Sequence, residues 1–409
     1  MGINALLPFV DKAAGSDVHL SDFAGKIAAI DGYYWLHRGA RLCPIEMVRG
    51  TYATGFVDYC IRQVELLRRH GVEPLVVLDG ARLPAKSGTE ERRHDKRKHA
   101  AAEAAELLRR GMREQATAAY LKAVNITAEH AYQFILALRK RQVRYIVAPY
   151  EADAQIAKLA TSGEVHLVLA EDSDMLAFGC PRVLTKLDYG SGHGRLLERS
   201  KLQAAKDGGQ AMFQPWNEWD QGGRFLELCI LAGCDYLDAI KGVAIKSAHK
   251  LLKQHKTAEK VAKFLGMEGK FPDGPAGLAE YLEQLQQAKE TFRHQRVYDP
   301  KLKKVVPLTP PPPNAPIMPH CGADIADDLA YKLCELGALH PETWQQLVVP
   351  GAPPERPQQQ QPQPQPLPPP PPPVQQQPSA ASSSSTASTV TSAFQPSRPA
   401  GGSSSQMAA

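Results

Sequence analysis

The hydrophobic pattern of the chain is dominated by short apolar runs that each end in acidic residues. Three such runs are Lys26–Ile30, Leu75–Leu78 and Leu167–Ala170. Short continuous apolar runs are typical of strands that are buried on both faces of a sheet. Between the first two runs, Gly55–His70 carries apolar residues at helical spacing. Strands alternating with helices predict an α/β fold with a mostly parallel central sheet flanked by helices.

The same pattern predicts elements outside this alternation. Helices are expected at Asn4–Lys12, at Thr127–Lys140 with Thr127 as its N-cap, and at Asp324–Leu336 with Gly337 as its stop. A short strand is expected at residues 182–186. Residues 190–223 contain scattered Trp and Gly residues and are too weakly patterned to assign.

A dense, mainly basic segment covers residues 86–113 and has almost no apolar face before Leu107. Its helix propensity is high, so we expect an exposed helix that spans solvent or forms only in context. Three interpretations remain open. The segment is a solvated helix face, a nuclear import signal, or a source of cations that face a phosphate opposite a metal site.

Carboxylates follow each predicted strand. Asp31 and Asp79 come directly after two of the runs, and Asp172 and Asp174 follow the third. In an extended chain, residues two apart point to the same side, so Asp172 and Asp174 would repel each other without a cation between them. A solvated loop is the simpler interpretation of a single Asp-x-Asp, but the repetition of the arrangement argues against it.

Three more carboxylates complete the set. Glu151 and Asp153 lie at a helix start marked by Pro149, and Asp235 follows an apolar helix over Leu228–Cys234. Residues two apart diverge on a helix, so Glu151 and Asp153 are expected to flank a cluster rather than hold one ion together. Open α/β sheets bind ligands at the carboxyl ends of their strands. Oxygen ligands without a nearby His–Cys cluster favour Mg²⁺ or Mn²⁺. Two such ions roughly 3.5–4 Å apart catalyse in-line phosphodiester displacement.

Gly242 opens a predicted tight turn that leads into a helix ending near Leu252. Lys246 and Lys250 lie on this helix, and a glycine turn at a basic helix N-terminus suits sequence-independent contact with a DNA backbone. Ordinary helix-turn-helix packing explains these residues equally well.

The composition indicates the cellular compartment of the protein and the character of its C-terminal segment. The chain has 409 residues and a net charge of +5, which says little about its partners. No apolar stretch approaches the roughly 18 residues of a membrane span, so no membrane partner is expected. The seven cysteines form no C-x-x-C pair and indicate a reduced, intracellular protein. From Gly351 the composition is rich in Pro, Gln and Ser, which predicts a disordered tail over 351–409.

Several motifs in order carry a resemblance to a known family. They are Met1-Gly-Ile3, Asp31-Gly-Tyr-Tyr-Trp-Leu-His37, Leu78-Asp-Gly80, Pro84-Ala-Lys86, Ala148-Pro-Tyr-Glu-Ala-Asp-Ala-Gln155, Glu171-Asp-Ser-Asp-Met-Leu-Ala-Phe-Gly179 and Gly233-Cys-Asp-Tyr-Leu237. Together they resemble the structure-specific 5′ nucleases of the flap endonuclease and XPG type, and within that family the eukaryotic exonuclease 1 group. The resemblance implies a PIN-like 5′ nuclease fold with a helical arch and a helix–two-turn–helix element. It implies one catalytic domain over 1–350, with nuclease regions at about 1–100 and 130–255 and the helix–two-turn–helix at about 233–256.

The resemblance also implies residue roles. A site for two Mg²⁺ ions, with Mn²⁺ as an alternative, is implied for Asp31, Asp79, Glu151, Asp153, Asp172, Asp174 and Asp235. Lys86 and Arg93 match the basic residues that the family presents to the scissile phosphate. Tyr33 and His37 match positions that stack on the DNA, and the Gly242 turn matches the element that grips duplex DNA with a monovalent cation.

The implied activity is 5′-to-3′ exonuclease and 5′ flap endonuclease action in DNA repair, in the nucleus. The implied substrate is double-stranded DNA with a 5′ end, nick, gap or flap, and mismatch-repair proteins are implied partners. The tail carries no recognisable sliding-clamp motif. Ala232, Ala239 and Ala244 depart from the family pattern, which leaves the monovalent-cation site open. The alternatives are a flap or junction endonuclease and a DNA-binding paralogue without activity, which the complete carboxylate set argues against.

Overall fold

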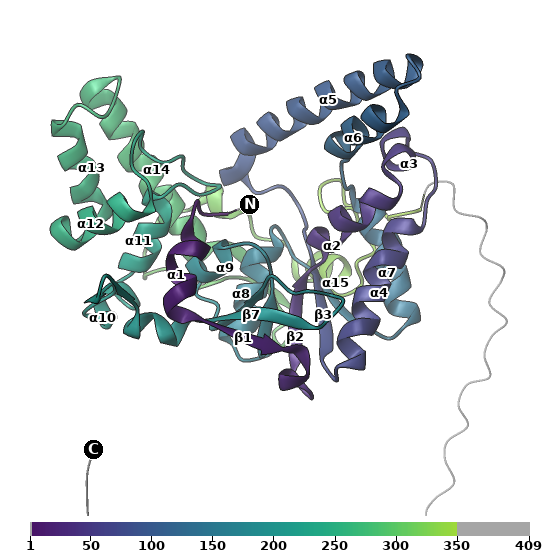
Figure 1. The fold of residues 1–409 in the computed structure, drawn as a ribbon, viewed down its shortest axis with the longest axis horizontal. Helices are drawn as coiled ribbons and strands as arrows, with labels where there is room; N and C mark the ends of the chain where they lie inside the picture. Colours follow the sequence, from purple (N-terminus) through teal and green to yellow (C-terminus); the bar gives the residue numbers. More distant parts are fainter. Residues whose placement is uncertain (1, 350–409) are drawn as a thin grey trace, which may run out of the picture. The chain divides into compact units, whose positions relative to one another are not determined.

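The centre of the computed structural model is a seven-stranded sheet with helices around it (Figure 1). The structure describes residues 2–349. The sheet order is β1-β7-β6-β5-β2-β3-β4, and neighbouring strands from β6 to β4 are parallel, whereas β7 and β1 are antiparallel to their neighbours. The strands are β1 Gly15–His19, β2 Ile27–Asp31, β3 Glu73–Leu78, β4 Arg144–Val147, β5 Leu167–Leu169, β6 Arg182–Thr185 and β7 His193–Glu198. The predicted mostly parallel α/β fold is confirmed.

Helices cover both faces of this sheet because its strand residues alternate between two cores. Ala29, Val77 and Val168 face one core, and Ile30, Leu78 and Leu169 face the other. The first core is completed by α1 Leu6–Ala14, α8 Ala152–Thr161, α9 Asp174–Ala177, α11 Arg224–Leu231, α12 Ile245–His255, α13 Ala258–Met267 and α14 Gly274–His294. The second is completed by α2 Gly32–Gly39, α3 Pro44–Arg49, α4 Gly55–Arg69, α7 Ala128–Lys140 and α15 Asp327–Cys334.

The basic segment forms a long helix that rises away from the sheet (Figure 1). It comprises α5 Ser87–Arg109, preceded by the 3-10 turn η3 Pro84–Lys86 and followed by α6 Arg113–Ala123. Ala104 of α5 packs against Ala119 and Tyr120 of α6 in a small apolar cluster of its own. A helix that is polar along most of its length is therefore stabilised at its far end, by contact with α6.

The remaining elements are a C-terminal hairpin and several short segments. The hairpin pairs β10 Arg296–Asp299 with β11 Lys304–Pro307. The short elements are α10 Trp216–Trp219, β8 Lys206–Asp207, β9 Gln210–Ala211 and the 3-10 turns η1 Leu20–Phe23, η2 Ala40–Leu42, η4 Arg199–Ala204 and η5 Pro319–Cys321. The described residues fall in one compact unit. The predicted tail over 351–409 lies outside the described residues.

The structure assigns one segment that the sequence pattern left open and corrects one expectation. Residues 190–223 contain the antiparallel strand β7, which the sequence pattern did not reveal because its apolar residues are confined to Leu196 and Leu197. The expected exposure of the basic segment does not extend to Lys86, whose side chain is only 11% exposed because carboxylates surround its ammonium group.

Candidate active site

The strand order brings the predicted carboxylates to one edge of the sheet. The parallel neighbours β5, β2, β3 and β4 have their carboxyl ends side by side. Asp31 is the last residue of β2, Asp79 follows β3, and Asp172 follows β5. Helix α8, which follows β4, supplies Asp153 and begins at its N-cap residue Glu151. These carboxylates therefore lie at the carboxyl edge of the sheet, where open α/β sheets bind their ligands.

Backbone amides hold the two strand-end carboxylates in place. Asp31 accepts hydrogen bonds from the backbone N–H groups of Tyr33 and Tyr34, at 2.8 and 3.1 Å, and so caps α2. Asp79 accepts one from the backbone N–H of Ala152, at 2.7 Å, which ties the end of β3 to the start of α8. Gly80 leaves room for this approach, because a Cβ there would lie 2.0 Å from the Ala148 carbonyl oxygen.

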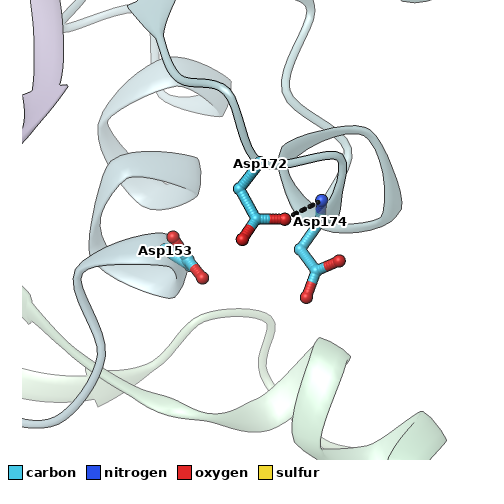
Figure 2. Close-up of side chains that lie close together, drawn as sticks. All are labelled: Asp153, Asp172 and Asp174. Atoms are coloured by element: carbon cyan, nitrogen blue, oxygen red, sulfur yellow. Dashed lines mark hydrogen bonds between the residues drawn. The ribbon is translucent and has the colours of Figure 1, made fainter. Parts of the chain in front are cut away.

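Asp153, Asp172 and Asp174 form the tightest carboxylate group among the described residues. One oxygen from each lies within 4.8 Å of the others, and Figure 2 shows the three carboxylates facing a shared space. The extended geometry predicted for Asp172 and Asp174 is wrong. The backbone N–H of Asp174 donates to Asp172 Oδ1 at 3.0 Å, and Asp174 begins helix α9. A turn closed by this bond, rather than strand alternation, brings the pair together.

The N-terminal residues pack against the turn formed by residues 172–174. The backbone N–H of Ile3 donates to Asp174 Oδ1 at 3.1 Å, and the Ser173 hydroxyl donates to the Ile3 carbonyl at 3.2 Å. Gly2 has a φ of +86°, and a Cβ on it would lie 1.9 Å from Asp172 Oδ1. Only glycine therefore fits between the N-terminal backbone and the carboxylates.

Two basic side chains, Lys86 and Arg93, contact the carboxylate cluster. The Lys86 ammonium pairs with Glu151 and, at 3.1 Å, with Asp235 Oδ2. The Arg93 guanidinium lies 3.2 Å from the same Asp235 oxygen. Lys86 is buried by these partners, whereas Arg93, in the second turn of α5, is 37% exposed. Both predicted arch residues therefore contact predicted metal ligands directly.

Burial and mutual repulsion raise the pKa of most of these acids. Burial, with added repulsion from Asp172, raises the pKa of Asp31 to about 6. Burial and the charge of Asp31 raise that of Asp79 to about 7. The pKa values of Asp153 and Asp174 also rise well above the ordinary range, through burial and the charge of Asp172. Concentrated negative charge of this kind is relieved by a bound cation.

Asp235 differs from these four acids. Although burial acts in the opposite direction, Lys86 and then Arg93 lower the pKa of Asp235. Burial also disfavours the charge on Lys86, yet Glu151 and Asp235 raise the Lys86 pKa well above its ordinary value. Lys86 and Asp235 are therefore held in their charged forms by each other.

A cleft of about 550 Å³ opens over the cluster. Six of the seven predicted carboxylates line it, and Asp174 lies behind them. Tyr33, His37, Lys86 and Arg93 also line it. Burial, followed by the charges of Arg97 and Arg93, lowers the pKa of His37, so its ring is favoured in the neutral form. The cleft thus has an acidic floor and a basic wall supplied by η3 and α5.

Three predicted residues lie away from this cleft. Gly242, with a φ of +84°, belongs to the loop between α11 and α12, as the tight-turn prediction required. Lys246 and Lys250 are exposed one turn apart on α12. They form a separate basic surface on an element whose other face packs into the core through Ala248 and Leu252.

Several residues that contact the site were not predicted. Arg97 on α5 and His340 and Glu342 near the C-terminal end of the described chain line the cleft. Tyr236 and Gln295 contact Glu151 through their side chains. Tyr236 had a signal in the sequence as the neighbour of Asp235, and Arg97 had one as part of the basic segment 86–113. Gln295, His340 and Glu342 are brought in by tertiary packing.

The donor set fits divalent metal ions. All seven side chains offer carboxylate oxygens, the ligands that hard cations prefer. Burial and the charges of neighbouring acids raise the pKa of four of them, Asp31, Asp79, Asp153 and Asp174, which a bound cation would relieve. Among residues 2–349, no helix is long and apolar enough to cross a membrane.

Comparisons with known proteins agree with this geometry. Sequence profiles of the XPG N-terminal domain and the XPG I-region match residues 1–100 and 142–235. Exonuclease 1 of Arabidopsis thaliana is 38% identical over 351 residues, covering 84% of this chain and 45% of that protein. Exonuclease 1 of Danio rerio is 36% identical over 367 residues, covering 87% of this chain and 43% of that protein. The chain thus spans less than half the length of these relatives.

A further relative is covered more fully. DNA damage-inducible protein DIN7 of Saccharomyces cerevisiae is 33% identical over 310 residues, covering 75% of this chain and 69% of DIN7. Among solved structures, the catalytic core of Rad2 in complex with DNA substrate shares the fold, with a TM-score of 0.50 at 16% identity, over 82% of this chain and 96% of that chain. XPG-type nucleases are metal-dependent, which the carboxylate cluster fits. The chain therefore belongs to the XPG family of nucleases and contains both its N-terminal domain and its I-region.

Proposed function

We propose that this protein is a Mg²⁺-dependent, structure-specific 5′-to-3′ DNA exonuclease that also cuts 5′ flaps. The observation that carries the proposal is a single cleft with a floor of carboxylates and a wall containing Lys86 and Arg93. The names of the relatives, exonuclease 1 and exodeoxyribonuclease 1, support the activity. The Rad2 catalytic core was solved in complex with a DNA substrate, which supports DNA as the class of ligand.

The charge of the cluster supports two ions rather than one. Seven carboxylates gather at this site, and the ion pairs at the site bring Lys86 and Arg93 against them. One divalent ion would leave a large excess of negative charge beside an anionic phosphate, whereas two would nearly offset it. When bound, two Mg²⁺ ions would activate a water and stabilise the leaving oxygen of an in-line displacement, and Mn²⁺ is the proposed substitute.

The chain's own residues have distinct proposed roles. Asp31, Asp79, Glu151, Asp153, Asp172, Asp174 and Asp235 hold the metal. Lys86 and Arg93 place positive charge where negative charge develops on the phosphate. Tyr33 and His37, which line the same cleft, stack on the DNA near the cleaved bond. Lys246 and Lys250 contact the duplex backbone from α12, so recognition depends on DNA shape and not on base sequence.

The domain layout is proposed to follow the same division. Residues 1–350 form the catalytic domain, with its nuclease regions and its helix–two-turn–helix at about 233–256, and residues 351–409 form a tail. We propose a nuclear role in DNA repair. Mismatch-repair proteins are the proposed partners.

The proposal is tested with purified protein on 5′-labelled blunt, nicked and flapped duplexes, with Mg²⁺ or with EDTA. We expect Mg²⁺-dependent release of short products from blunt or nicked ends and a slower cut at the flap. The matched variants are Asp172→Asn in the cluster and Asp17→Asn on the surface of β1, where Asp17 is 89% exposed. Cleavage by Asp172→Asn at the unmodified rate, or equal cleavage in EDTA, would refute the assignment. A strong preference for flaps or junctions over ends would replace exonuclease with endonuclease.

A further inference from the structure

Helix α8, which carries Glu151 and Asp153, is held along one face by the C-terminal hairpin. Glu151, Gln155 and Lys158 are spaced four and three residues apart, so they lie on the same face of the helix. Each of them contacts the segment 295–299, which joins α14 to β10 and forms that strand. The segment therefore lies alongside the helix that supplies two proposed metal ligands.

The middle contact fixes the register between the two elements. Gln155 is fully buried, and its side-chain Nε2 donates to the Tyr298 carbonyl at 2.8 Å while its Oε1 accepts from the Tyr298 N–H at 2.7 Å. Lys158 pairs with Asp299 at 3.1 Å at the far end. Because Gln155 satisfies both backbone groups of Tyr298, a shift of α8 along β10 would leave buried polar groups unpaired.

The contact at Glu151 reaches the metal site itself. Glu151 Oε2 accepts hydrogen bonds from the Tyr236 hydroxyl and, at 3.5 Å, from Gln295 Nε2. Its other oxygen, Oε1, pairs with Lys86. Two donors on Oε2 fix the rotation of the carboxylate, so that Oε1 is the oxygen directed to a cation. Outer hydrogen bonds of this kind orient metal-binding carboxylates in other proteins.

Gln295 carries an energetic cost that packing alone does not explain. Its side chain is fully buried, and its Oε1 has no hydrogen-bond partner within residues 2–349. An unsatisfied buried acceptor costs about 1–3 kcal/mol, whereas an apolar side chain of similar size would fill the space without that cost. With its amide reversed, the carbonyl oxygen would face the Glu151 carboxylate and repel it. The hydrogen bond donated to Glu151 is therefore the interaction for which a glutamine amide is needed at position 295.

We propose that Gln295 and Tyr236 are positioning residues that set the Glu151 carboxylate for a divalent ion. Gln295 lies outside both segments matched by the XPG profiles, so the C-terminal third of the described chain contributes to the metal site. The inference rests on the proposed metal-dependent function and adds to it the residues that determine metal affinity.

The test is the affinity of the full-length protein for Mn²⁺ alone, measured by calorimetry in the absence of DNA. Gln295→Leu removes the donor and keeps the volume. We expect its weakest Mn²⁺ site to bind about tenfold less tightly or worse, as is typical when such a support is lost. The Mg²⁺ concentration for half-maximal cleavage should rise by a similar factor, while the rate at saturating Mg²⁺ recovers. Gln284→Leu, the same change on the exposed face of α14, should leave both values unchanged.

A second variant keeps the test independent of folding at position 295. Tyr236→Phe removes only the hydroxyl that donates to Glu151, and it should weaken Mn²⁺ binding in the same way without lowering the melting temperature in EDTA. Folded variants that bind Mn²⁺ as tightly as the unmodified protein would overturn this inference alone. Failure of the unmodified protein to bind Mn²⁺ would overturn the proposed function and the inference together. A lower melting temperature in EDTA with unchanged Mn²⁺ affinity would assign both residues to packing and overturn the inference.

Discussion

Replacing Asp79 by Asn should stabilise the metal-free protein at neutral and higher pH. The carboxylate lies among other acids at the end of β3, and burial with the charge of Asp31 raises its pKa from 3.8 to about 7. Asn is nearly isosteric, and its Oδ1 can keep the hydrogen bond from the backbone N–H of Ala152. The substitution therefore removes the repulsion and leaves the packing intact.

The size and sign of the effect follow from the pKa. Between pH 3.8 and about pH 7, the folded protein holds a proton on Asp79 that the unfolded chain has lost. Stability therefore falls as the pH rises through this window and stays low above it. A shift of about 3 units corresponds to about 4 kcal/mol. Asp31 shares part of the repulsion and ionises more easily when Asp79 is neutral. We therefore expect the free energy of unfolding of Asp79→Asn to exceed that of the unmodified protein by about 2–4 kcal/mol above the window.

The assay is thermal or urea unfolding in EDTA from about pH 3 to about pH 8.5, which spans the whole window. The stability difference between Asp79→Asn and the unmodified protein should be near zero below pH 3.8, rise through the window and reach its plateau above about pH 7. Asp17→Asn is the control, because Asp17 is 89% exposed on β1. Added Mg²⁺ should stabilise the unmodified protein at about pH 8 much more than it stabilises the variant. A difference that does not change with pH, or a variant that is less stable at high pH, would refute the reasoning.

Three further predictions address other parts of the molecule. Gly2→Ala should lower cleavage and Mn²⁺ affinity, because the added Cβ would displace Asp172. Gly50→Ala is the control, since Gly50 also has a positive φ but has open space around it, and equal effects of the two changes would trace the loss to backbone strain. Arg93→Ala should reduce single-turnover cleavage at saturating DNA by at least about 10²-fold while duplex affinity falls only modestly; a normal rate once DNA is saturating would place Arg93 in a binding surface only. Removal of residues 351–409 should leave the melting temperature and the cleavage of nicked duplex unchanged, and a melting temperature several degrees lower would refute the assignment of these residues as a tail.

The fold and the carboxylates at the sheet edge could be predicted because each depends on local pattern. Asp31 and Asp79 directly follow buried strands, and parallel strands necessarily place their carboxyl ends together. Thr127 likewise occupies the N-cap of α7, where its sequence position predicted it. Proximity between such residues follows from topology once the strands are recognised. The roles assigned to these carboxylates stay predictions.

The parts that could not be predicted depend on contacts between distant segments. Strand β7 has too few apolar residues to be recognised alone, and its pairing with β6 defines it. The turn that joins Asp172 to Asp174 replaces the extended geometry expected from an Asp-x-Asp spacing, because Asp174 begins a helix. Gln295 is separated from Glu151 by 144 residues, and no local pattern marks it.

Lys86 shows how a correct candidate can carry a wrong physical expectation. Its position in a basic segment indicated an exposed side chain, whose loss would hardly affect the fold. The structure places it between Glu151 and Asp235, so its removal would take the paired ammonium from Glu151 and one of the cations from Asp235, which still contacts Arg93. Breaking a buried ion pair by removing one member typically costs about 3–5 kcal/mol. Loss of activity in a Lys86 variant therefore combines instability with lost chemistry, whereas Arg93, seven residues further along and 37% exposed, separates the two. The catalytic role of the basic wall is thus tested cleanly at Arg93 first, and at Lys86 only once stability in EDTA has been measured.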